Sequence, residues 1–414
     1  MILENVIILT QNISHEIIYG DLYIDDNKIV NIVRKPYTIS QKSKVRVVMP
    51  ALYNLHMHFG ETIFRAHCDN MNLFEYLDVS HNTYLLEEWK REEPNIHELS
   101  TYVTLIEAIK NGTGYVVGNR SWKQLEKMGM KGLGLYPLVN IDKLHSMYVD
   151  FKPDNELAAL FIQSVYLVEQ QKFEEVAEML SKYPELKIFI HVCETQWEIK
   201  HIYEKYKCSP IEFLDKMNIL NENTFLVHSI YMTENDLDII QKANAKIVLC
   251  PVSNMKLKDG RPNIFQFIDR GIMVNVATDG FATNNSASLL EELKVLSLIS
   301  DQKITSENLL DLVTKNPAQC IYKDNKHGII DIGCFADIAV FETDICNAYE
   351  LDMVSNSIIY NYTAFHCMLL MMEGKIYMND GRVTCIDEEN IYIKFSELAS
   401  NLFAIGKRPS LIKN

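Results

Sequence analysis

The sequence predicts an α/β protein built on a TIM-type (β/α)8 barrel, with a small β-sandwich domain formed by both chain ends. Short apolar runs recur through the middle of the chain and are separated by longer amphipathic stretches, which is typical of parallel strands alternating with helices. Both ends show the shorter period of β-hairpins instead. The length of 414 residues fits a large barrel with a satellite domain better than one ordinary core.

The two chain ends are expected to pair into one composite domain. Near the N-terminus, apolar residues from Leu22 to Ile32 flank the polar turn Asp25-Asp26-Asn27-Lys28, which is a hairpin signal. Near the C-terminus, the stretch "HCMLLMMEGKIYMNDGRVT" places short strands on either side of Gly374 and adds a second turn. We therefore expect a β-sandwich domain from residues 1–50 and 335–414 and a barrel from residues 51–334.

The barrel strands are predicted from eight apolar runs. The first ends at His56, and the others lie in "TGYVVGN", "KGLGLYPLV", "LAALFIQSVYLV", "LKIFIHV", "NTFLVHS", "AKIVLCPV" and "IMVNVATDG". Between them, apolar residues recur at helical spacing, as in Leu99, Val103, Ile106 and Ile109 before the stop signal Gly112. The alternation predicts the order of strands and helices around the barrel.

The composition excludes several classes of protein. The net charge of −15 argues against a nucleic-acid partner and against docking on an anionic membrane. The first twenty residues do not resemble a secretory signal, and no stretch approaches the roughly 20 apolar residues of a membrane span. The nine cysteines are scattered and form no C-x-x-C pair, which favours reduced, mostly buried thiols and a cytoplasmic location.

Polar residues end four of the eight runs, where a parallel barrel keeps its chemistry. Alternation along the first strand points His56 and His58 to the same side, toward the barrel mouth. Taken alone, a strand-end histidine is often a hydrogen-bonded structural residue, and an aspartate there often caps the next helix. As a set, however, three imidazoles and a carboxylate suit Zn²⁺ or another divalent first-row metal. The set comprises His56, His58, His191 and Asp279, with Glu194 and His228 at two of the same strand ends.

These residues lie in segments that resemble a known family. In chain order, "MPALYNLHMHFGE", "IHVCET", "LVHS", "CPVSNMKL" and "ATDGFATNN" are similar to the amidohydrolase superfamily. The most similar branch is the chlorohydrolase and nucleoside-deaminase group, which includes adenosylhomocysteine, guanine and aminofutalosine deaminases. The stretch "GIIDIGCFADIAVFE" resembles the place where such chains leave the barrel for the sheet domain. The resemblance covers almost the whole chain, and its motifs are much more specific for the superfamily than for a substrate.

The resemblance implies roles for the strand-end residues. His56, His58, His191 and Asp279 would bind one divalent metal per chain, with zinc expected first and iron or manganese as alternatives. Glu194 would move a proton from a metal-bound water to a ring nitrogen and then to the leaving amine. His228 would orient that water, and Asp279 would act as a base. Members with two metals carry a carbamylated lysine after the fourth strand; Gln163 stands in that stretch here, which predicts a site with one metal.

Six further residues are candidates for contact with a substrate. Gln163 and Leu249 stand where purine deaminases often carry histidine or another polar residue, which leaves the substrate open. Each candidate also has a structural alternative: Glu61 and Arg65 could pair with each other, Gln163 could hold a loop, and Trp197 could pack on the barrel exterior. In "PVSNMKL", Ser253 and Asn254 could orient substrate or close a turn. The candidate contacts are Glu61, Arg65, Gln163, Trp197, Ser253 and Asn284.

The leading hypothesis is a metal-dependent hydrolase that deaminates an aminated heterocycle such as a purine base, a nucleoside or a related metabolite, and releases ammonia. The alternatives at the same site are removal of chloride or an alkylamine from a triazine, and opening of a cyclic amide. A metal-free scaffold is disfavoured because the ligand set is complete. We further expect a homo-oligomer. The acidic stretch "LLEEWKREEP" is predicted to be a solvated helix face, and whether residues 61–95 form a lid stays open.

Overall fold

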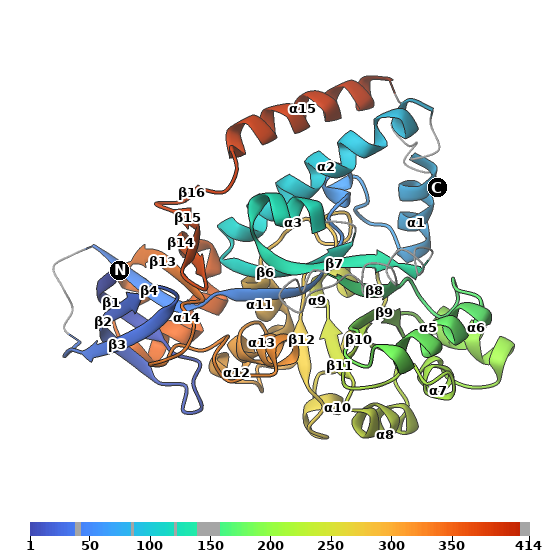
Figure 1. Cartoon of the computed structure of the whole chain (residues 1–414), viewed down its shortest axis with the longest axis horizontal. Helices are drawn as coiled ribbons and strands as arrows, with labels where there is room; N and C mark the ends of the chain where they lie inside the picture. The colour runs from blue at the N-terminus through green and yellow to red at the C-terminus, as the bar shows by residue number, and fades with distance from the viewer. Residues whose placement is uncertain (38–42, 84–86, 120–121, 139–157, 406–414) are drawn as a thin grey trace.

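Two eight-stranded sheets organise the molecule. The computed structural model describes residues 1–37, 43–83, 87–119, 122–138 and 158–405, and the description below concerns these residues. One sheet is the barrel, and the other lies beside it and is built from both ends of the chain (Figure 1). The N-terminus therefore lies in the second sheet, away from the barrel.

The barrel is parallel throughout, in the strand order β5 to β12. Its two end strands meet at a seam, where the backbone N–H of Asp279 donates to the carbonyl of His56 at 3.1 Å. The Asn54 side chain makes two further hydrogen bonds across this seam: it donates to the Thr278 hydroxyl at 2.8 Å and accepts from the Thr278 backbone N–H at 3.2 Å. All eight predicted runs form strands in the predicted order: β5 Leu52–Met57, β6 Thr113–Asn119, β7 Lys131–Pro137, β8 Ala158–Ile162, β9 Ile188–Val192, β10 Thr224–His228, β11 Lys246–Leu249 and β12 Val274–Val276.

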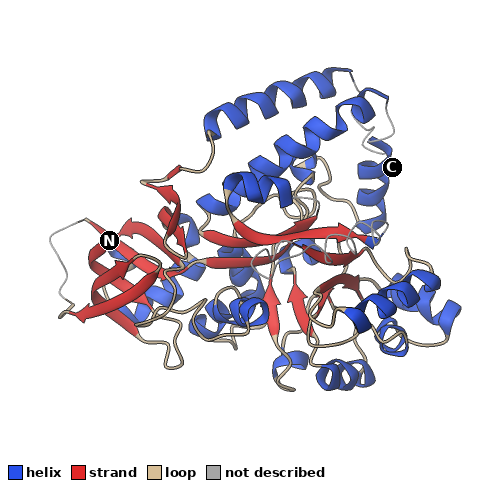
Figure 2. Ribbon diagram, viewed as in Figure 1, coloured by secondary structure: helices blue, strands red, loops and turns tan. Residues whose placement is uncertain are grey.

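Helices surround the barrel (Figure 2), and many of them contribute buried apolar residues to its core cluster. The predicted helix before Gly112 is α2, and Gly112 ends it with a φ of +82° that favours glycine. In α5 the residues buried on the barrel are Phe173, Val176, Met179 and Leu180. The helices of this part are η1 Glu61–Phe64, α1 Leu73–Thr83, α2 Glu87–Lys110, α3 Trp122–Met128, α5 Gln170–Lys182, α6 Gln196–Tyr206, α7 Pro210–Lys216, α8 Glu234–Ala243, α9 Pro251–Lys256, α10 Phe265–Ile268, α11 Leu289–Ile299, α12 Ser306–Asp311 and α13 Lys315–Tyr322.

The second sheet is mixed and has the strand order β16-β15-β14-β13-β4-β1-β2-β3. Strands β1 and β4 pair in parallel, and the remaining neighbours are antiparallel. Both predicted hairpins are confirmed, at Asp26 and at Gly374, where φ is positive. The strands are β1 Ile2–Leu9, β2 Ile17–Asp25, β3 Lys28–Arg34, β4 Lys44–Pro50, β13 Ile338–Asp344, β14 His366–Met372, β15 Lys375–Asn379 and β16 Arg382–Val383; the short helices η3 Ile345–Asn347, η4 Leu351–Met353, α14 Val354–Tyr360 and η5 Tyr362–Ala364 lie between β13 and β14.

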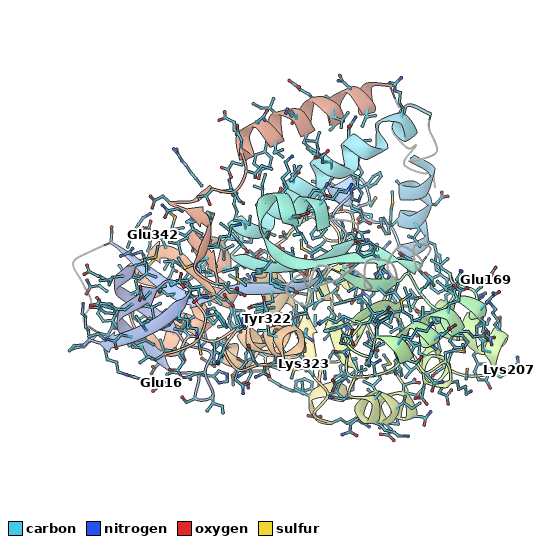
Figure 3. All side chains as sticks on the ribbon, viewed as in Figure 1. Glu16, Glu169, Lys207, Tyr322, Lys323 and Glu342 are labelled. Atoms are coloured by element: carbon cyan, nitrogen blue, oxygen red, sulfur yellow. The ribbon has the colours of Figure 1, made fainter. Side chains whose placement is uncertain are left out.

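A buried carboxylate fastens the sheet to the bottom of the barrel. Asp337, fully buried just before β13, accepts hydrogen bonds from Tyr53 of β5 at 3.0 Å and from the backbone of Glu373 at 2.7 Å. The His327 ring lies 2.7 Å from the same carboxylate and stacks on Tyr322, which Figure 3 labels at this junction. Such a fully paired buried carboxylate costs little and fixes how the two parts meet.

The last described element is a long helix that the sequence patterns did not predict. This helix, α15 (Glu388–Ile405), leaves the sheet and packs along α2 (Figure 1). Its residues Phe395, Leu398 and Leu402 join a small apolar cluster with Ile63 of η1 and Leu73 of α1. The helix thus helps to hold the elements that follow the first barrel strand. The predicted limits of the two domains stay a prediction.

None of the nine cysteines forms a disulfide, and seven of them are buried. This matches the expected reduced, mostly buried thiols. Among the described helices, none is both long and apolar enough to cross a membrane.

Candidate active site

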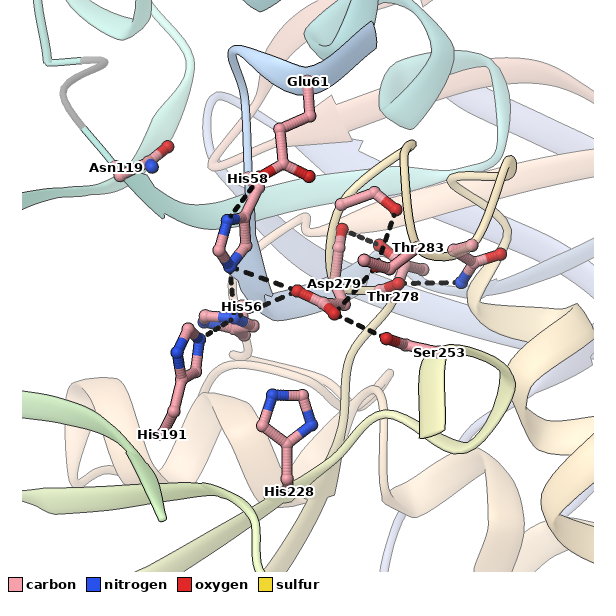
Figure 4. A network of polar contacts seen from close by, with 12 residues as sticks. His56, His58, Glu61, Asn119, His191, His228, Ser253, Thr278, Asp279 and Thr283 are labelled. Atoms are coloured by element: carbon pink, nitrogen blue, oxygen red, sulfur yellow. Dashed lines mark hydrogen bonds and ion pairs between the residues drawn. The ribbon is translucent and has the colours of Figure 1, made fainter. Parts of the chain in front are cut away.

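Four predicted ligand side chains converge at the barrel mouth (Figure 4). The Nε2 atom of His56 lies 3.1 Å from Nε2 of His58 and 3.1 Å from Nε2 of His191. Oδ1 of Asp279 lies 3.3 Å from the first of these nitrogens and 3.2 Å from Nε2 of His58. The residues come from β5, β9 and the end of β12, so the strand register brings them together.

This arrangement fits a bound cation. Hydrogen bonds alone cannot satisfy the cluster, because one proton on Nε2 of His56 can serve only one of its three close neighbours. The other ring nitrogen of His56, Nδ1, is buried and has no partner among the described residues. The cluster contains two overlapping groups of three residues, and within each group the ligand atoms lie within 4.8 Å of one another. The groups are His56, His191 and His228, and His56, His58 and Asp279. Imidazole nitrogens with one carboxylate oxygen are a donor set suited to Zn²⁺ and similar divalent metals.

The electrostatics of the cluster favour a positive charge at its centre. Burial lowers the pKa of His191 well below its ordinary value and also lowers that of His56, so both rings are neutral and can act as ligands. Burial would raise the pKa of Asp279, but His58 and His56 outweigh it and hold that pKa well below its usual range. Burial would likewise lower the pKa of His58, but Glu61 and Asp279 raise it to about 9. A cation at the centre would take the place of that proton.

The carboxylate of Asp279 is held from its second oxygen. Oδ2 accepts hydrogen bonds from Ser253 at 2.6 Å and from Thr283 at 2.9 Å, which leaves Oδ1 facing the histidines. Asp279 therefore does not cap the following helix α11, whose cap is Ser288. Asp279 and His228 both have positive φ, of 60° and 73°. Such backbone strain in non-glycine residues is common at functional sites.

Glu194 and His228 lie beside the cluster, as predicted. Oε1 of Glu194 is 3.5 Å from Nε2 of His228. Asn254 donates to Nδ1 of this histidine at 3.0 Å, which places the proton of the neutral ring on Nε2, toward the glutamate. Burial lowers the pKa of His228 to about 3. The ring is therefore a neutral donor.

Two further carboxyl groups surround Glu194. Burial, and then the Asp259 carboxyl that is hydrogen-bonded to it, raise the pKa of Glu194 well above its ordinary value. Burial also raises the pKa of Asp259 to about 7. Oε2 of Glu198 accepts the backbone N–H of Glu194 at 2.9 Å and fixes the turn after β9. A carboxyl group whose pKa is raised toward neutral pH can both take up and give up a proton, which suits proton transfer.

The cavity beside this cluster is small. Its volume is about 30 Å³, close to that of one water molecule. Strand ends form its floor, and Leu73, Tyr76 and Leu77 of α1 form its roof. The remaining lining residues are His58, Gln163, Tyr166, His191, Glu194, His228, Leu257, Asp279 and Thr283. A larger open groove of about 580 Å³ lies outside, between α6, α7 and α8, and holds no cluster of metal-ligand side chains among its described lining.

Two of the candidate substrate contacts lie at the cluster. Gln163 lines the cavity, with Nε2 at 3.5 Å from Nδ1 of His191. Glu61 does not pair with Arg65; its Oε1 lies 2.9 Å from Nδ1 of His58. Its position is thus next to a ligand rather than in the cavity lining.

The other candidates have structural partners. Arg65 binds Glu107 with two hydrogen bonds, at 2.9 and 2.6 Å, and lies over the Phe281 ring. Asn284 donates to the Thr278 carbonyl at 2.7 Å and to Glu292. Ser253 is fully buried against Asp279, and Leu249 is buried in the core at the end of β11.

Trp197 lies at the rim of the mouth. It is 44% exposed and packs edge-on against Phe74 of α1 and against Tyr166, a cavity residue. This differs from packing on the barrel exterior, because the ring joins α6 to the roof of the cavity.

The sequence patterns missed Tyr76, Tyr166, Glu198 and Asp259 as parts of the site. Asp259 lies in the loop after α9, and Tyr76 lies on a helix over the mouth, so neither follows a strand. Residues 61–95 were open as a loop or lid; the described part of this segment is largely helical, as η1, α1 and the start of α2. Most side chains of the acidic stretch at 85–94 lie outside the described part of the structure, so its predicted solvated face stays a prediction.

The fold and this cluster define an α/β-barrel hydrolase with a candidate metal centre at the carboxyl ends of its strands. More particularly, the chain belongs to the amidohydrolase family, whose sequence profile matches residues 47–376.

Comparisons with individual proteins agree with this membership. The chain is 24% identical to the 5-methylthioadenosine/S-adenosylhomocysteine deaminase of Clostridium tetani, and the match covers 97% of this chain and 99% of the relative. Its fold is similar to that of a zinc-bound adenosine deaminase from Xanthomonas campestris, with a TM-score of 0.84, 18% identity and coverage of 97% and 98% of the two chains. A triazine hydrolase from Arthrobacter aurescens has a TM-score of 0.83 at 18% identity, over 96% and 99% of the chains.

Proposed function

We propose that this protein is a metal-dependent deaminase that converts an aminated heterocycle, such as a purine base, a nucleoside or a related metabolite, to its oxo form. The observation that carries the proposal is the crowding around Nε2 of His56, which lies within 3.3 Å of Nε2 of His58, of Nε2 of His191 and of Oδ1 of Asp279. Glu194 and His228 lie beside this cluster. The relative from Clostridium tetani and the zinc-bound adenosine deaminase, both named as deaminases, support the reaction type.

We assign the metal to His56, His58, His191 and Asp279, one ion per chain, with zinc first and iron or manganese as alternatives. Three of these residues, His56, His58 and Asp279, form one candidate ligand group, and the fourth, His191, contacts His56 at 3.1 Å. The fit rests on the three ligand atoms around Nε2 of His56, which one proton cannot serve together, and on the charge-favouring centre described above. When bound, a divalent cation there supplies Lewis acidity and makes a nucleophile available from water near neutral pH. Gln163 after β8, in place of lysine, supports a single ion.

The chain's own residues would carry the protons. Glu194 takes a proton from water and gives it to a ring nitrogen next to the attacked carbon, which makes that carbon more electrophilic. A carbon–oxygen bond then forms, the carbon–nitrogen bond to the exocyclic amine breaks, and the second proton leaves with ammonia. His228 donates from Nε2 and orients the attacking oxygen. Such a placed acid–base group contributes about 10²–10⁴-fold to the rate.

The cavity is too small for a heterocyclic substrate in this structure. The cavity of about 30 Å³ is far smaller than the roughly 300 Å³ or more that ligand pockets usually offer. We therefore propose that α1 moves outward when the substrate binds, because Leu73, Tyr76 and Leu77 line the cavity. This assigns the role of lid to α1 within residues 61–95. We further propose a homo-oligomer in the cytoplasm.

The experiment is ammonia release by metal-replete protein against adenine, guanine and cytosine compounds, their nucleosides, adenosylhomocysteine, aminofutalosine and an aminotriazine. We expect release from one class of compound and loss of at least 10²-fold in Glu194→Gln. Glu175→Gln, at a partly exposed position of α5 that pairs with Lys172 away from the cavity, is the matched control and keeps wild-type activity. No release from any compound by protein that holds one metal per chain would contradict the deaminase proposal.

A second candidate function, the hydrolytic removal of chloride or an alkylamine from a triazine ring, uses the same site. Gln163 in the cavity, where purine deaminases often carry histidine, favours it. Chloride release from a chlorotriazine without ammonia release from the panel would select this candidate.

A further inference from the structure

One carboxylate oxygen joins a metal ligand to the helix that roofs the cavity. Oε1 of Glu61 lies 2.9 Å from Nδ1 of His58, and the same atom accepts a hydrogen bond from the Tyr76 hydroxyl at 2.6 Å. Glu61 opens η1, three residues after this ligand, and Tyr76 lies on α1. Figure 4 shows the Glu61 carboxylate pointing at the His58 ring from the side opposite Asp279.

The position of Glu61 is fixed by its surroundings. Its side chain is only 16% exposed, and a Cβ on Gly280 would come within 2.1 Å of its Oε2 atom. Gly280 directly follows the ligand Asp279, so a larger residue there would displace the glutamate from His58. The glycine therefore leaves room for this carboxylate at the metal site.

Tyr76 is fixed from both sides. It is 6% exposed and belongs to the apolar cluster that includes Phe64 of η1, Leu257 after α9 and Leu402 of α15. It also lines the cavity with its α1 neighbours Leu73 and Leu77. The hydroxyl group can reach Glu61 only while α1 lies over the mouth, so this hydrogen bond belongs to the closed arrangement.

We propose that Glu61 is a positioning residue for the metal ligand His58, and that Tyr76 makes this positioning depend on closure of α1. A histidine that donates Nδ1–H to a carboxylate presents the lone pair of Nε2 to the metal, with its ring orientation fixed. Loss of such a partner lowers metal affinity by about 10–100-fold in comparable sites. The inference rests on the metal site of the proposed function and is independent of which heterocycle reacts.

The first test is the Zn²⁺ affinity of the full-length chain, measured by competition with a chromogenic chelator. We expect Kd to rise about 10–100-fold in Glu61→Gln and about tenfold in Tyr76→Phe. Because the tyrosine acts through the glutamate, the double variant should bind no more weakly than Glu61→Gln alone. Tyr53→Phe is the matched control: it removes a buried hydroxyl that donates to the Asp337 carboxylate at 3.0 Å, at the other end of the barrel, and keeps the wild-type Kd.

The second test uses the reciprocity of coupled equilibria. If closure of α1 strengthens zinc binding, zinc must favour closure to the same degree. Amide hydrogen exchange across residues 73–83 should slow on addition of Zn²⁺ in the wild type and in Tyr53→Phe, but much less in Tyr76→Phe.

The outcomes separate this inference from the proposed reaction. The inference is wrong if Glu61→Gln and Tyr76→Phe bind zinc as tightly as Tyr53→Phe. It is also wrong if the rate of amide hydrogen exchange across α1 is the same with and without zinc. A wild-type chain that takes up no Zn²⁺, Fe²⁺ or Mn²⁺ would overturn both the metal site and the inference. Weakened zinc binding in the two variants, with no ammonia release by the wild type, would support the inference and overturn the deaminase reaction alone.

Discussion

Replacement of Glu198 by glutamine should make stability less dependent on pH. Glu198 lies in the first turn of α6 and is 1% exposed. Burial raises the pKa of its carboxyl from 4.5 to about 7, although backbone N–H groups of Glu194, Cys193 and Thr195 oppose the shift. Glutamine has the same shape, keeps one acceptor oxygen for the backbone of Glu194, and does not ionise.

The sign follows from the direction of the shift. Because the folded pKa exceeds the unfolded one, the folded state holds more protons between pH 4.5 and 7, and stability falls as pH rises through this window. The full shift corresponds to roughly 3 kcal/mol, of which about 2.5 kcal/mol is lost between pH 5 and pH 8. At about 2.1 cal/mol/K per residue, a chain of 414 residues has an unfolding entropy near 0.9 kcal/mol/K, so this loss lowers Tm by about 3 °C.

The assay is calorimetry of both proteins, saturated with metal, from pH 5 to pH 8. The Tm difference between Glu198→Gln and the wild type should become more positive by about 3 °C over this range. Subtracting the Tm difference at pH 5 from the Tm difference at pH 8 cancels any cost of the substitution that does not depend on pH, such as a disturbed turn at Glu194. A difference that stays constant with pH would refute the reasoning, because it would show that Glu198 ionises in the fold as easily as in the unfolded chain.

Three further predictions concern the core, the metal and the proton-transfer group. Phe173→Ala removes a fully buried ring that packs at 5.1 Å on Phe213, so Tm should fall by about 3–6 °C in calorimetry, and an unchanged Tm would contradict the packing. Dialysis against a chelator should lower Tm by about 5 °C relative to protein at 1,000 times the Kd of the metal; equal values would argue against a bound ion. Asp259→Asn removes the carboxyl that raises the pKa of Glu194, so the limb of the pH–rate profile that reports Glu194 should move to lower pH, and a limb that does not move would assign it to another group.

The metal-ligand and proton-transfer residues that the sequence predicted all lie at or just after strand ends. His56, His191 and His228 lie within the predicted strands, and alternation along a strand gives the side to which each points. Parallel strands of one barrel share a mouth, so these positions could be brought together from the sequence without knowing any contact. The same logic predicted the hairpins, because their turn residues are local signals.

The parts that could not be predicted depend on contacts between distant elements. Arg65 pairs with Glu107, 42 residues away on α2, although its own loop suggested a role in the pocket. Asp259 reaches Glu194 from a loop whose conformation no periodic pattern describes. The helix α15 follows a run of strands and packs on α2 only because the chain returns across the barrel. Each depends on tertiary packing that overrides local signals.

The small cavity and the shared Glu61 oxygen together limit how a substrate can enter. Moving α1 outward breaks the hydrogen bond from Tyr76, which contributes about 0.5–1.5 kcal/mol net. It also exposes the contacts of Leu73 and Leu77, each worth about 1.5–3 kcal/mol when fully buried. Together these costs stay below the roughly 8 kcal/mol that a substrate bound at about 1 μM supplies. A heterocycle that packs under α1 would restore most of the apolar contacts itself. The Tyr76–Glu61 bond then decides whether α1 closes over the heterocycle with His58 in its metal-binding orientation.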